Sequence, residues 1–264
     1  MIIDAHCHIY PDKIAEKASQ ATGGFYGIPM AFDGKVSTLL REGKKAGIDR
    51  FAVQSVATTP KQVRSINDFI AQTVAAYPDI LFGLGTLHPE SEDIAADVAH
   101  LRALGLRGVK LHPDIQQFKL DDYRCLKIYE LCEEAGLPLL IHTGDNRYDF
   151  SNPNRLIPIL RIYTGLTVVG AHMGGWSMWE EAARQLCDLP NLYVDCSSSF
   201  YALDDEIMKR VIALYGGERV LFGTDYPMWH PDEELRRLRG LGLDSETMEN
   251  ILWRNAAKVF NLPL

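Results

Sequence analysis

The sequence predicts an α/β fold in which eight strand-and-helix units close into a (β/α)₈ (TIM) barrel. Short apolar or β-branched runs alternate with amphipathic stretches along the whole chain, which is the pattern of a parallel sheet. Eight such runs can be counted, and the length of 264 residues is close to the ~250 residues typical of a barrel. An open, doubly wound sheet shares the alternation and is the alternative.

The expected strands are short apolar runs with few polar residues inside them. They lie at residues 2–5, 51–54, 81–84, 108–111, 139–142, 167–170, 192–195 and 220–223. Strands of a parallel sheet are covered on both faces, so a polar residue within or directly after one of them is informative.

The helices between them follow from apolar residues at steps of three and four. The clearest is predicted at residues 121–135, with Asp121 as its cap and Gly136 as its stop. Similar patterns predict helices at residues 61–76, 91–104, 179–186 and 245–260, the last opened by a Ser-Glu capping signal.

The connection at residues 10–34 is long for the first strand-to-helix link and contains Gly23, Gly24, Gly27 and Pro29. It has two interpretations: a lid at the barrel mouth, or a surface excursion with a short helix around residues 15–19. No segment has the composition of an interdomain linker. We therefore expect a single domain over residues 1–264.

The charge balance favours a small-molecule partner. Twenty-seven basic and 35 acidic residues give a net charge of -8, which argues against nucleic acid or an anionic membrane. No apolar stretch approaches the ~18 residues of a membrane span, and no secretion signal is visible. Five cysteines without CxxC spacing indicate reduced thiols. The expected location is the cytoplasm.

Five polar residues stand at the ends of expected strands. His6 and His8 project to the same side of the first strand, because side chains alternate along a strand. His142, His172 and Asp225 follow the fifth, sixth and eighth strands. All five are therefore expected at the C-terminal mouth, where barrel enzymes place their sites.

Three imidazoles and one carboxylate form a ligand set suited to a divalent metal with an open position for water. His6, His8, His142 and Asp225 are accordingly predicted to bind one ion. Zinc is the expected metal, with manganese or another divalent ion as the alternative. A lone strand histidine is more often a core or rim residue, but joint placement on separate strands favours the metal.

A metal-activated water attacks an electrophilic carbon without a serine or cysteine nucleophile. In this chemistry His172 would orient the water or polarise the substrate. Asp225 would carry a proton to the leaving group. These two residues are the predicted catalytic groups.

Four motifs resemble the amidohydrolase superfamily: DAHCH (4–8), IHTG (141–144), AHMGG (171–175) and GTDYP (223–227). The sequence is most similar to the amidohydrolase-related branch, which includes aminocarboxymuconate-semialdehyde decarboxylase. The resemblance extends from the first strand to Asn255 and Ala256. It implies the same metal ligands, His6, His8, His142 and Asp225, with His172 beside the reactive water.

Members of this branch divide between hydrolysis of C–N, C–O or C–C bonds and nonoxidative decarboxylation, and the shared motifs do not separate the two. We expect a metal-dependent hydrolase of the amidohydrolase type that acts on a small carbonyl compound such as a lactone, amide or ring compound. Decarboxylation of an aromatic or unsaturated acid is the alternative. A catalytically silent metal- or ligand-binding barrel is a third possibility, against which the intact five-residue set weighs.

Lys110 and His112 lie at the end of the fourth expected strand, in the sequence KLHP (110–113). Two-metal amidohydrolases carry a carboxylated lysine on this strand as a bridge. Lys110 lies one step below the strand end, and a buried lysine also pairs with carboxylates. We expect a mononuclear site with an uncarboxylated Lys110, and with Lys110 or His112 contacting the substrate.

The remaining candidates for substrate contact lie on the expected mouth loops: Arg147, Trp176, Tyr226 and His230. Aromatic rings and a guanidinium suit an aromatic or planar acid, so the predicted substrate is a small carbonyl or carboxylate compound. Alternatively, the tryptophans pack loops against the barrel or cover a subunit contact. A homo-oligomer is therefore left open.

Overall fold

The computed structural model describes residues 1–263 and shows parallel strands that alternate with helices. The strands are β1 (Ile3–His8), β2 (Arg50–Gln54), β3 (Leu81–Gly83), β4 (Gly85–Thr86), β5 (Val109–Leu111), β6 (Leu139–Ile141), β7 (Val168–Gly170), β8 (Leu192–Asp195) and β9 (Val220–Leu221). Each pairs in parallel with the next except across the break between β3 and β4. These two are pieces of one barrel strand interrupted at Leu84, whose N–H still donates to the carbonyl of Val53 at 3.0 Å.

Backbone hydrogen bonds close the barrel between its first and last strands. The N–H of Ala5 donates to the carbonyl of Phe222 at 2.9 Å, and that of His8 to the carbonyl of Tyr226 at 2.7 Å. Cys7 and Tyr226 form a parallel bridge. The predicted (β/α)₈ barrel is thus confirmed, and the open-sheet alternative is wrong because an open sheet leaves these groups without strand partners.

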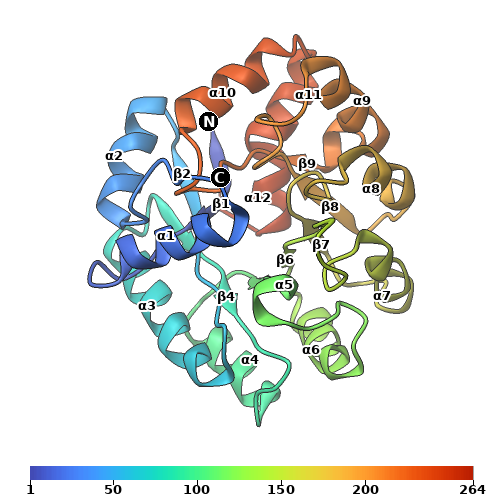
Figure 1. Ribbon diagram of the computed structural model, residues 1–264. Helices are drawn as coiled ribbons and strands as arrows, with labels where there is room; N and C mark the ends of the chain where they lie inside the picture. The colour runs from blue at the N-terminus through green and yellow to red at the C-terminus, as the bar shows by residue number, and fades with distance from the viewer. Residues whose placement is uncertain (264) are drawn as a thin grey trace.

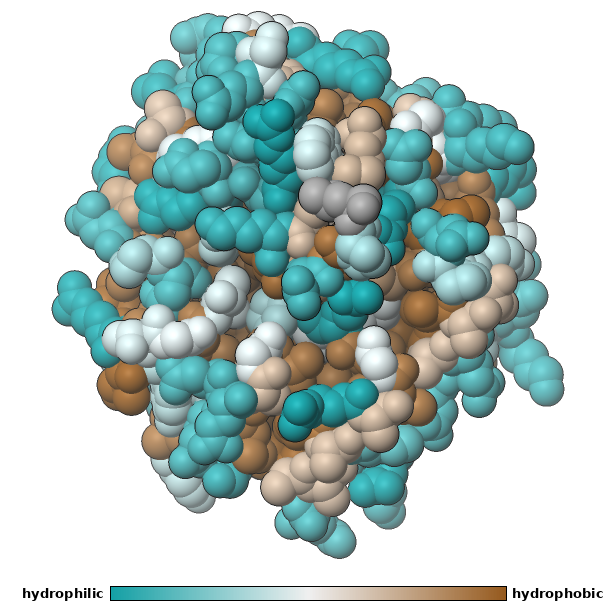
Figure 2. All heavy atoms as spheres, turned by 180° about the vertical axis from the view of Figure 1, so that it is seen from behind, coloured by the Kyte–Doolittle hydropathy of each residue, from teal (hydrophilic) through white to brown (hydrophobic). Residues whose placement is uncertain are grey.

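The outer helices form a ring around the strands (Figure 1). They are α2 (Val36–Ala46), α3 (Val63–Ala76), α4 (Ile94–Ala103), α6 (Leu126–Ala135), α7 (Leu156–Ile162), α8 (Trp179–Leu186), α9 (Asp205–Tyr215), α10 (Pro231–Gly240) and α11 (Ser245–Glu249). Most of their inward apolar residues join one buried cluster with the outer face of the strands. The face opposite to that of Figure 1 carries hydrophilic side chains over much of its area (Figure 2). No helix within residues 1–263 has the length and apolar character needed to cross a membrane.

Two expected helix starts are corrected by the structure. Asp122, not Asp121, caps the turn Tyr123–Cys125 that leads into α6, because its carboxylate accepts the N–H of Arg124 at 2.9 Å. Asp244, rather than Ser245, caps α11. Gly136 ends α6 as predicted, with a left-handed φ of 63°.

The C-terminal helix closes the bottom of the barrel. After α11 the chain runs through a π-helical segment, Asn250–Arg254, into α12 (Asn255–Val259). Ala256 and Phe260 pack with apolar side chains inside the barrel, and the ring of Phe260 lies 5.3 Å from that of Phe82. This end of the barrel is thus filled, and the strand ends that carry the predicted site residues lie at the opposite end.

Helix α1 (Ala15–Tyr26) is longer than the expected helix at residues 15–19. It continues through Gly23 and Gly24 and ends at Gly27, whose φ is 68°. Gly23 is buried, and a Cβ there would lie 2.8 Å from the carbonyl oxygen of Ile28. The close packing explains a glycine inside the helix. In Figure 1, α1 crosses the strands instead of joining the outer ring.

Candidate metal centre

Three of the four predicted metal ligands converge at the mouth of the barrel. The pleat of β1 places His6 and His8 on one side, with their Nε2 atoms 3.2 Å apart. Asp225 lies on the loop after β9, with a φ of 57°. Its Oδ1 is 3.3 Å from Nε2 of His6 and 3.6 Å from Nε2 of His8. Two imidazole nitrogens and a carboxylate oxygen gathered in this way form a donor set suited to a divalent ion.

Asp195 at the end of β8 orients His6. Its Oδ2 is 2.9 Å from Nδ1 of His6, which fixes the proton on Nδ1 and leaves the Nε2 lone pair facing Asp225. Burial alone would raise the pKa of Asp195, but His6 and His172 hold it below its ordinary value. Asp195 is not among the residues predicted from the sequence, although the signal that identified Asp225, a carboxylate at a strand end, applies to it equally.

Asp225 stays ionised for a similar reason. Burial opposes its charge, but the imidazoles of His6, His172 and His8 and the hydroxyl of Ser198 hold its pKa below the ordinary value. An ionised carboxylate is the form that binds a metal.

The structure places the fourth predicted ligand, His142, next to His172 instead of inside the group of His6, His8 and Asp225. Nδ1 of His142 is 3.0 Å from Nε2 of His172. Nε2 of His142 is buried, has no hydrogen-bond partner among residues 1–263, and lies 3.6 Å from Oδ2 of Asp114. His142 thus belongs to a second group with His112 and Asp114.

This second group is poorly arranged to bind an ion. The rings of His112 and His142 stack with their centroids 4.1 Å apart and an angle of 6° between them. Imidazole lone pairs lie in the ring plane, so those of two parallel rings run side by side and do not converge. Asp114 also already accepts the hydroxyl proton of Ser151. We infer a histidine stack here, not a second metal site.

His172 lies beside the triad of His6, His8 and Asp225. It follows β7 with a φ of 59°, and its ring stacks on that of His6 with centroids 5.2 Å apart. Its Nδ1 is 3.1 Å from the carbonyl oxygen of Ser197, so Nδ1 carries the proton, and Nε2, 3.0 Å from Nδ1 of His142, is an acceptor. Burial lowers the pKa of His172 to about 4, which keeps the ring neutral near pH 7.

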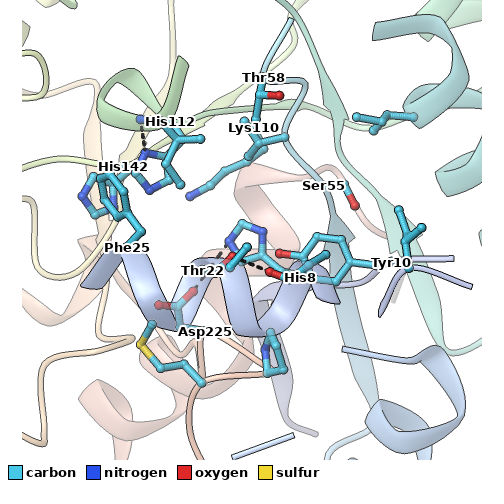
Figure 3. A pocket seen from close by; sticks show the side chains of 18 of the residues that line it. His8, Tyr10, Thr22, Phe25, Ser55, Thr58, Lys110, His112, His142 and Asp225 are labelled. Atoms are coloured by element: carbon cyan, nitrogen blue, oxygen red, sulfur yellow. Dashed lines mark hydrogen bonds and ion pairs between the residues drawn. The ribbon is translucent and has the colours of Figure 1, made fainter. Parts of the chain in front are cut away.

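Lys110 on β5 is completely buried among these groups. Its Nζ is 3.2 Å from Nε2 of His6. Burial lowers the pKa of Lys110 to about 8, against the opposing effect of Asp195 and Asp225. Figure 3 shows its amine pointing into the space between the stacked imidazoles and His8.

These side chains line one cavity of about 560 Å³. Its polar residues include His6, His8, Lys110, His112, His142, His172 and Asp225. Its walls are mainly apolar and include Ile14, Ala18, Phe25, Ile66, Phe69 and Met228. Several wall residues belong to α1, so part of the long first connection covers the site. Opening of this segment as a lid stays a prediction. The volume is within the range of small-molecule sites.

Two of the predicted substrate contacts, Tyr226 and His230, lie away from this cavity. The side chain of Tyr226 is buried, and its hydroxyl donates to the carbonyl of Lys35 at 2.7 Å. His230 is exposed at the start of α10 and packs edge-on against Phe32. Both follow Asp225 in sequence, but the turn after β9 directs them outward.

Arg147 and Trp176 also lie outside the cavity lining, on the outer side of α1. Arg147 pairs with the buried carboxylate of Asp145 through Nε at 2.9 Å and Nη2 at 2.7 Å. Trp176 packs edge-on against Tyr26 with ring centroids 5.1 Å apart. Arg147 therefore contacts the helix over the site, whereas Tyr26, which the sequence analysis missed, reaches into the cavity.

The closed barrel and the histidine cluster at its mouth place this chain in the class of (β/α)₈ barrels that carry a candidate metal centre. The sequence profile of the amidohydrolase family matches residues 3–262, and the chain belongs to this family. The resemblance found in the four motifs is thus confirmed.

Two curated relatives are decarboxylases by name. The 2-amino-3-carboxymuconate-6-semialdehyde decarboxylase of Dictyostelium discoideum is 28% identical over 75% of this chain and 66% of its own length, so the chain spans about two thirds of that relative. The gamma-resorcylate decarboxylase of a Polaromonas strain is 23% identical over 80% of each chain.

Solved structures share the fold over nearly the whole chain. An uncharacterized TIM-barrel protein from Bordetella bronchiseptica superposes with a TM-score of 0.83 at 23% identity, covering 99% of this chain and 98% of its own. Another similar structure is a dihydroxybenzoic acid decarboxylase from Polaromonas with bound manganese and the inhibitor 2-nitroresorcinol. Its TM-score is 0.76 at 17% identity, and the match covers 99% of this chain and 97% of that chain. For a putative 2-pyrone-4,6-dicarboxylic acid hydrolase from Pseudomonas putida, the TM-score is 0.70 at 20% identity, and the match covers 100% of this chain and 98% of that chain.

Proposed function

We propose that this chain is a metal-dependent, nonoxidative decarboxylase of a small aromatic or unsaturated carboxylic acid. The observation that carries the proposal is Lys110, a fully buried amine in a mainly apolar cavity, 3.2 Å from a candidate metal ligand. A cation in such surroundings suits a carboxylate on an otherwise apolar molecule. The names of both curated relatives support this alternative over the hydrolysis expected from the sequence.

In this proposal His6, His8 and Asp225 hold one divalent ion. Their convergence in a buried site fits such an ion. His142 is the proposed fourth ligand through its Nε2, which lacks a hydrogen-bond partner among residues 1–263 and in this structure faces Asp114 at 3.6 Å, outside the group of three. When bound, the ion supplies positive charge that binds and polarises oxygen atoms of the substrate. Manganese in a similar structure supports manganese as the ion, and zinc is the alternative.

The chain's own residues then bind and orient the acid. Lys110 pairs with the carboxylate, and the apolar side chains from α1 and α3 pack on the ring or unsaturated chain. Transfer of a carboxylate from water into an apolar cavity favours a transition state in which its charge is dispersed. Lys110 is not carboxylated in this proposal, because its amine is needed as a cation.

The reaction balances with one proton. The bond between the carboxyl carbon and its neighbour breaks, the electron pair stays on the neighbour, a proton replaces the carboxyl group there, and CO₂ leaves. His172 and Asp225 are the cavity groups to which we assign proton transfer. His172 is neutral, and its Nε2, which accepts a hydrogen bond from Nδ1 of His142, is suited to accept and return a proton when that contact opens.

Hydrolysis of a lactone or related ring compound is the second candidate. It is favoured by the same neutral His172, which lies next to the triad where a water would need a base. The similar structure of a putative 2-pyrone-4,6-dicarboxylic acid hydrolase also supports it.

The test is to load the protein with manganese or zinc and incubate it with a panel of hydroxybenzoates, unsaturated dicarboxylates and pyrone lactones. We expect one molecule of CO₂ to be released for each molecule of product, and the product should lack one carboxyl group. Lys110→Met should retain the metal and lower kcat/KM about 10- to 100-fold, the loss expected for a hydrogen bond to a charged group. Ring opening of a lactone without CO₂ would instead establish the second candidate.

A further inference from the structure

Arg147 holds the C-terminal turn of α1 over the cavity through a hydrogen bond and cation–π contacts. Its Nη1 donates to the carbonyl oxygen of Phe25 at 2.7 Å. Its guanidinium carbon lies within 5.5 Å of the ring centroids of Phe25, Tyr26, Tyr148 and Trp176. Asp145 accepts hydrogen bonds from Nε and Nη2 of Arg147 and so fixes the position of the guanidinium. The ionic and cation–π contacts therefore hold the backbone at the point where Tyr26 turns into the site.

Tyr26 accepts a hydrogen bond from His112. The Nδ1 of His112 accepts the backbone N–H of Ile115 at 3.3 Å, so in the neutral ring the proton is on Nε2. That Nε2 is 2.6 Å from the hydroxyl oxygen of Tyr26. Since the imidazole is the donor, the hydroxyl oxygen is the acceptor, and the proton of Tyr26 points elsewhere.

The other contact of the hydroxyl, Nδ1 of His142 at 3.4 Å, cannot accept that proton. Nδ1 of His172 donates to the carbonyl of Ser197, so Nε2 of His172 must accept from Nδ1 of His142 at 3.0 Å. Nδ1 of His142 is thus itself a donor. Among residues 1–263, the hydroxyl has hydrogen-bond contacts with these two imidazoles alone, which leaves its proton for a ligand in the cavity that Tyr26 lines.

We propose that Tyr26 determines specificity by donating its hydroxyl proton to an oxygen substituent on the ring of the substrate, and that Arg147 is the residue that positions it. The inference rests on the proposed function for the aromatic acid as substrate class. Lys110 forms an ion pair with the carboxylate of the substrate, and Tyr26 donates a hydrogen bond to a second oxygen, such as a phenolate. An acid without that oxygen would leave the donor unsatisfied and bind more weakly.

The test uses two probes that cannot release CO₂, 2-nitroresorcinol and nitrobenzene, and calorimetric titration of the metal-loaded protein. Tyr26→Phe should weaken binding of 2-nitroresorcinol about 10- to 100-fold and leave that of nitrobenzene unchanged, because only the former offers ring oxygens. Tyr148→Phe is the matched control: Tyr148 contacts the same guanidinium but is not part of the cavity lining, and neither affinity should change.

Arg147→Met tests the positioning role. It should reduce the affinity for 2-nitroresorcinol as Tyr26→Phe does, with metal content and nitrobenzene binding unchanged and with faster hydrogen exchange at residues 22–27. Three results would overturn the inference. Tyr26→Phe could weaken the binding of both probes, or of neither. The wild-type protein could also bind 2-nitroresorcinol no more tightly than nitrobenzene. Since no turnover is involved, absence of CO₂ release from the panel would refute the proposed function and leave this result standing.

Discussion

Ser198 donates a hydrogen bond from its hydroxyl to Oδ2 of Asp225 at 2.6 Å. The other oxygen, Oδ1, is thereby left facing His6 and His8. Ser198 is itself fixed, since it has a φ of 46° and accepts the indole N–H of Trp229 at 2.7 Å. The carboxylate of the candidate metal centre is therefore oriented by the loop that follows β8.

Ser198→Ala should weaken metal binding about 10- to 100-fold, the usual effect of removing a hydrogen bond that orients a ligand. Competition with a chelating dye measures the dissociation constant. Ser245→Ala, an exposed change at the start of α11, serves as the control. Equal affinities in the wild type and Ser198→Ala would show that this hydrogen bond does not orient a ligand.

His172→Ala should retain the metal and lose turnover. Its ring stacks on His6 but is not one of the converging ligands, and removal of a positioned acid–base group costs about 10²- to 10⁴-fold in kcat. Elemental analysis and circular dichroism check the metal and the fold. Near-normal kcat in the metal-loaded variant would remove His172 from the mechanism and leave Asp225 or His112 as the group that moves the proton.

Glu234 on α10 should make the protein less stable as the pH rises. Burial raises the pKa of Glu234 from 4.5 to about 8, and its Oε2 has no hydrogen-bond partner among residues 1–263. Between these values the folded state keeps a proton that the unfolded state has lost, so the free energy of unfolding falls with rising pH. Glu234→Gln, which cannot ionise, should remove this fall.

Each unit of pKa shift corresponds to about 1.4 kcal/mol, so the stability gained by Glu234→Gln should grow by a few kcal/mol between pH about 5 and about 8. Denaturant unfolding measures it. Glu92→Gln, an exposed change at a residue that does not perturb Glu234, should leave the pH dependence unchanged. A gain that is the same at both pH values would refute the buried-carboxylate explanation.

The strands could be predicted because their signal is local. Each of the eight predicted runs overlaps an observed strand, and helix Trp179–Leu186 has the predicted bounds. The strand-end rule also placed His6, His8 and Asp225 in one group, since the side to which a strand side chain points is fixed by its position.

Helix α1 could not be delimited from the sequence, because its C-terminal half depends on contacts with distant residues. Gly23 and Gly24 have low helix propensity, and it is Arg147, far along the chain, that bonds to the carbonyl of Phe25. For the same reason the sequence does not show that Arg147 lies outside the cavity and that Tyr26 reaches into it.

The orientation of His142 shows a second limit. Its place after β6 follows from the sequence, but the direction of its ring depends on the stack with His112 and the hydrogen bond to His172. No periodicity contains that information.

Anomalous diffraction from crystals of the manganese-loaded protein tests the metal centre most directly. The account predicts one ion per chain, bound by His6, His8 and Asp225 with His142 as the fourth ligand, beside an uncarboxylated Lys110. His6→Ala should abolish the peak. An ion between His112, Asp114 and His142, or two ions about 3.5 Å apart bridged by a carboxylated Lys110, would contradict it.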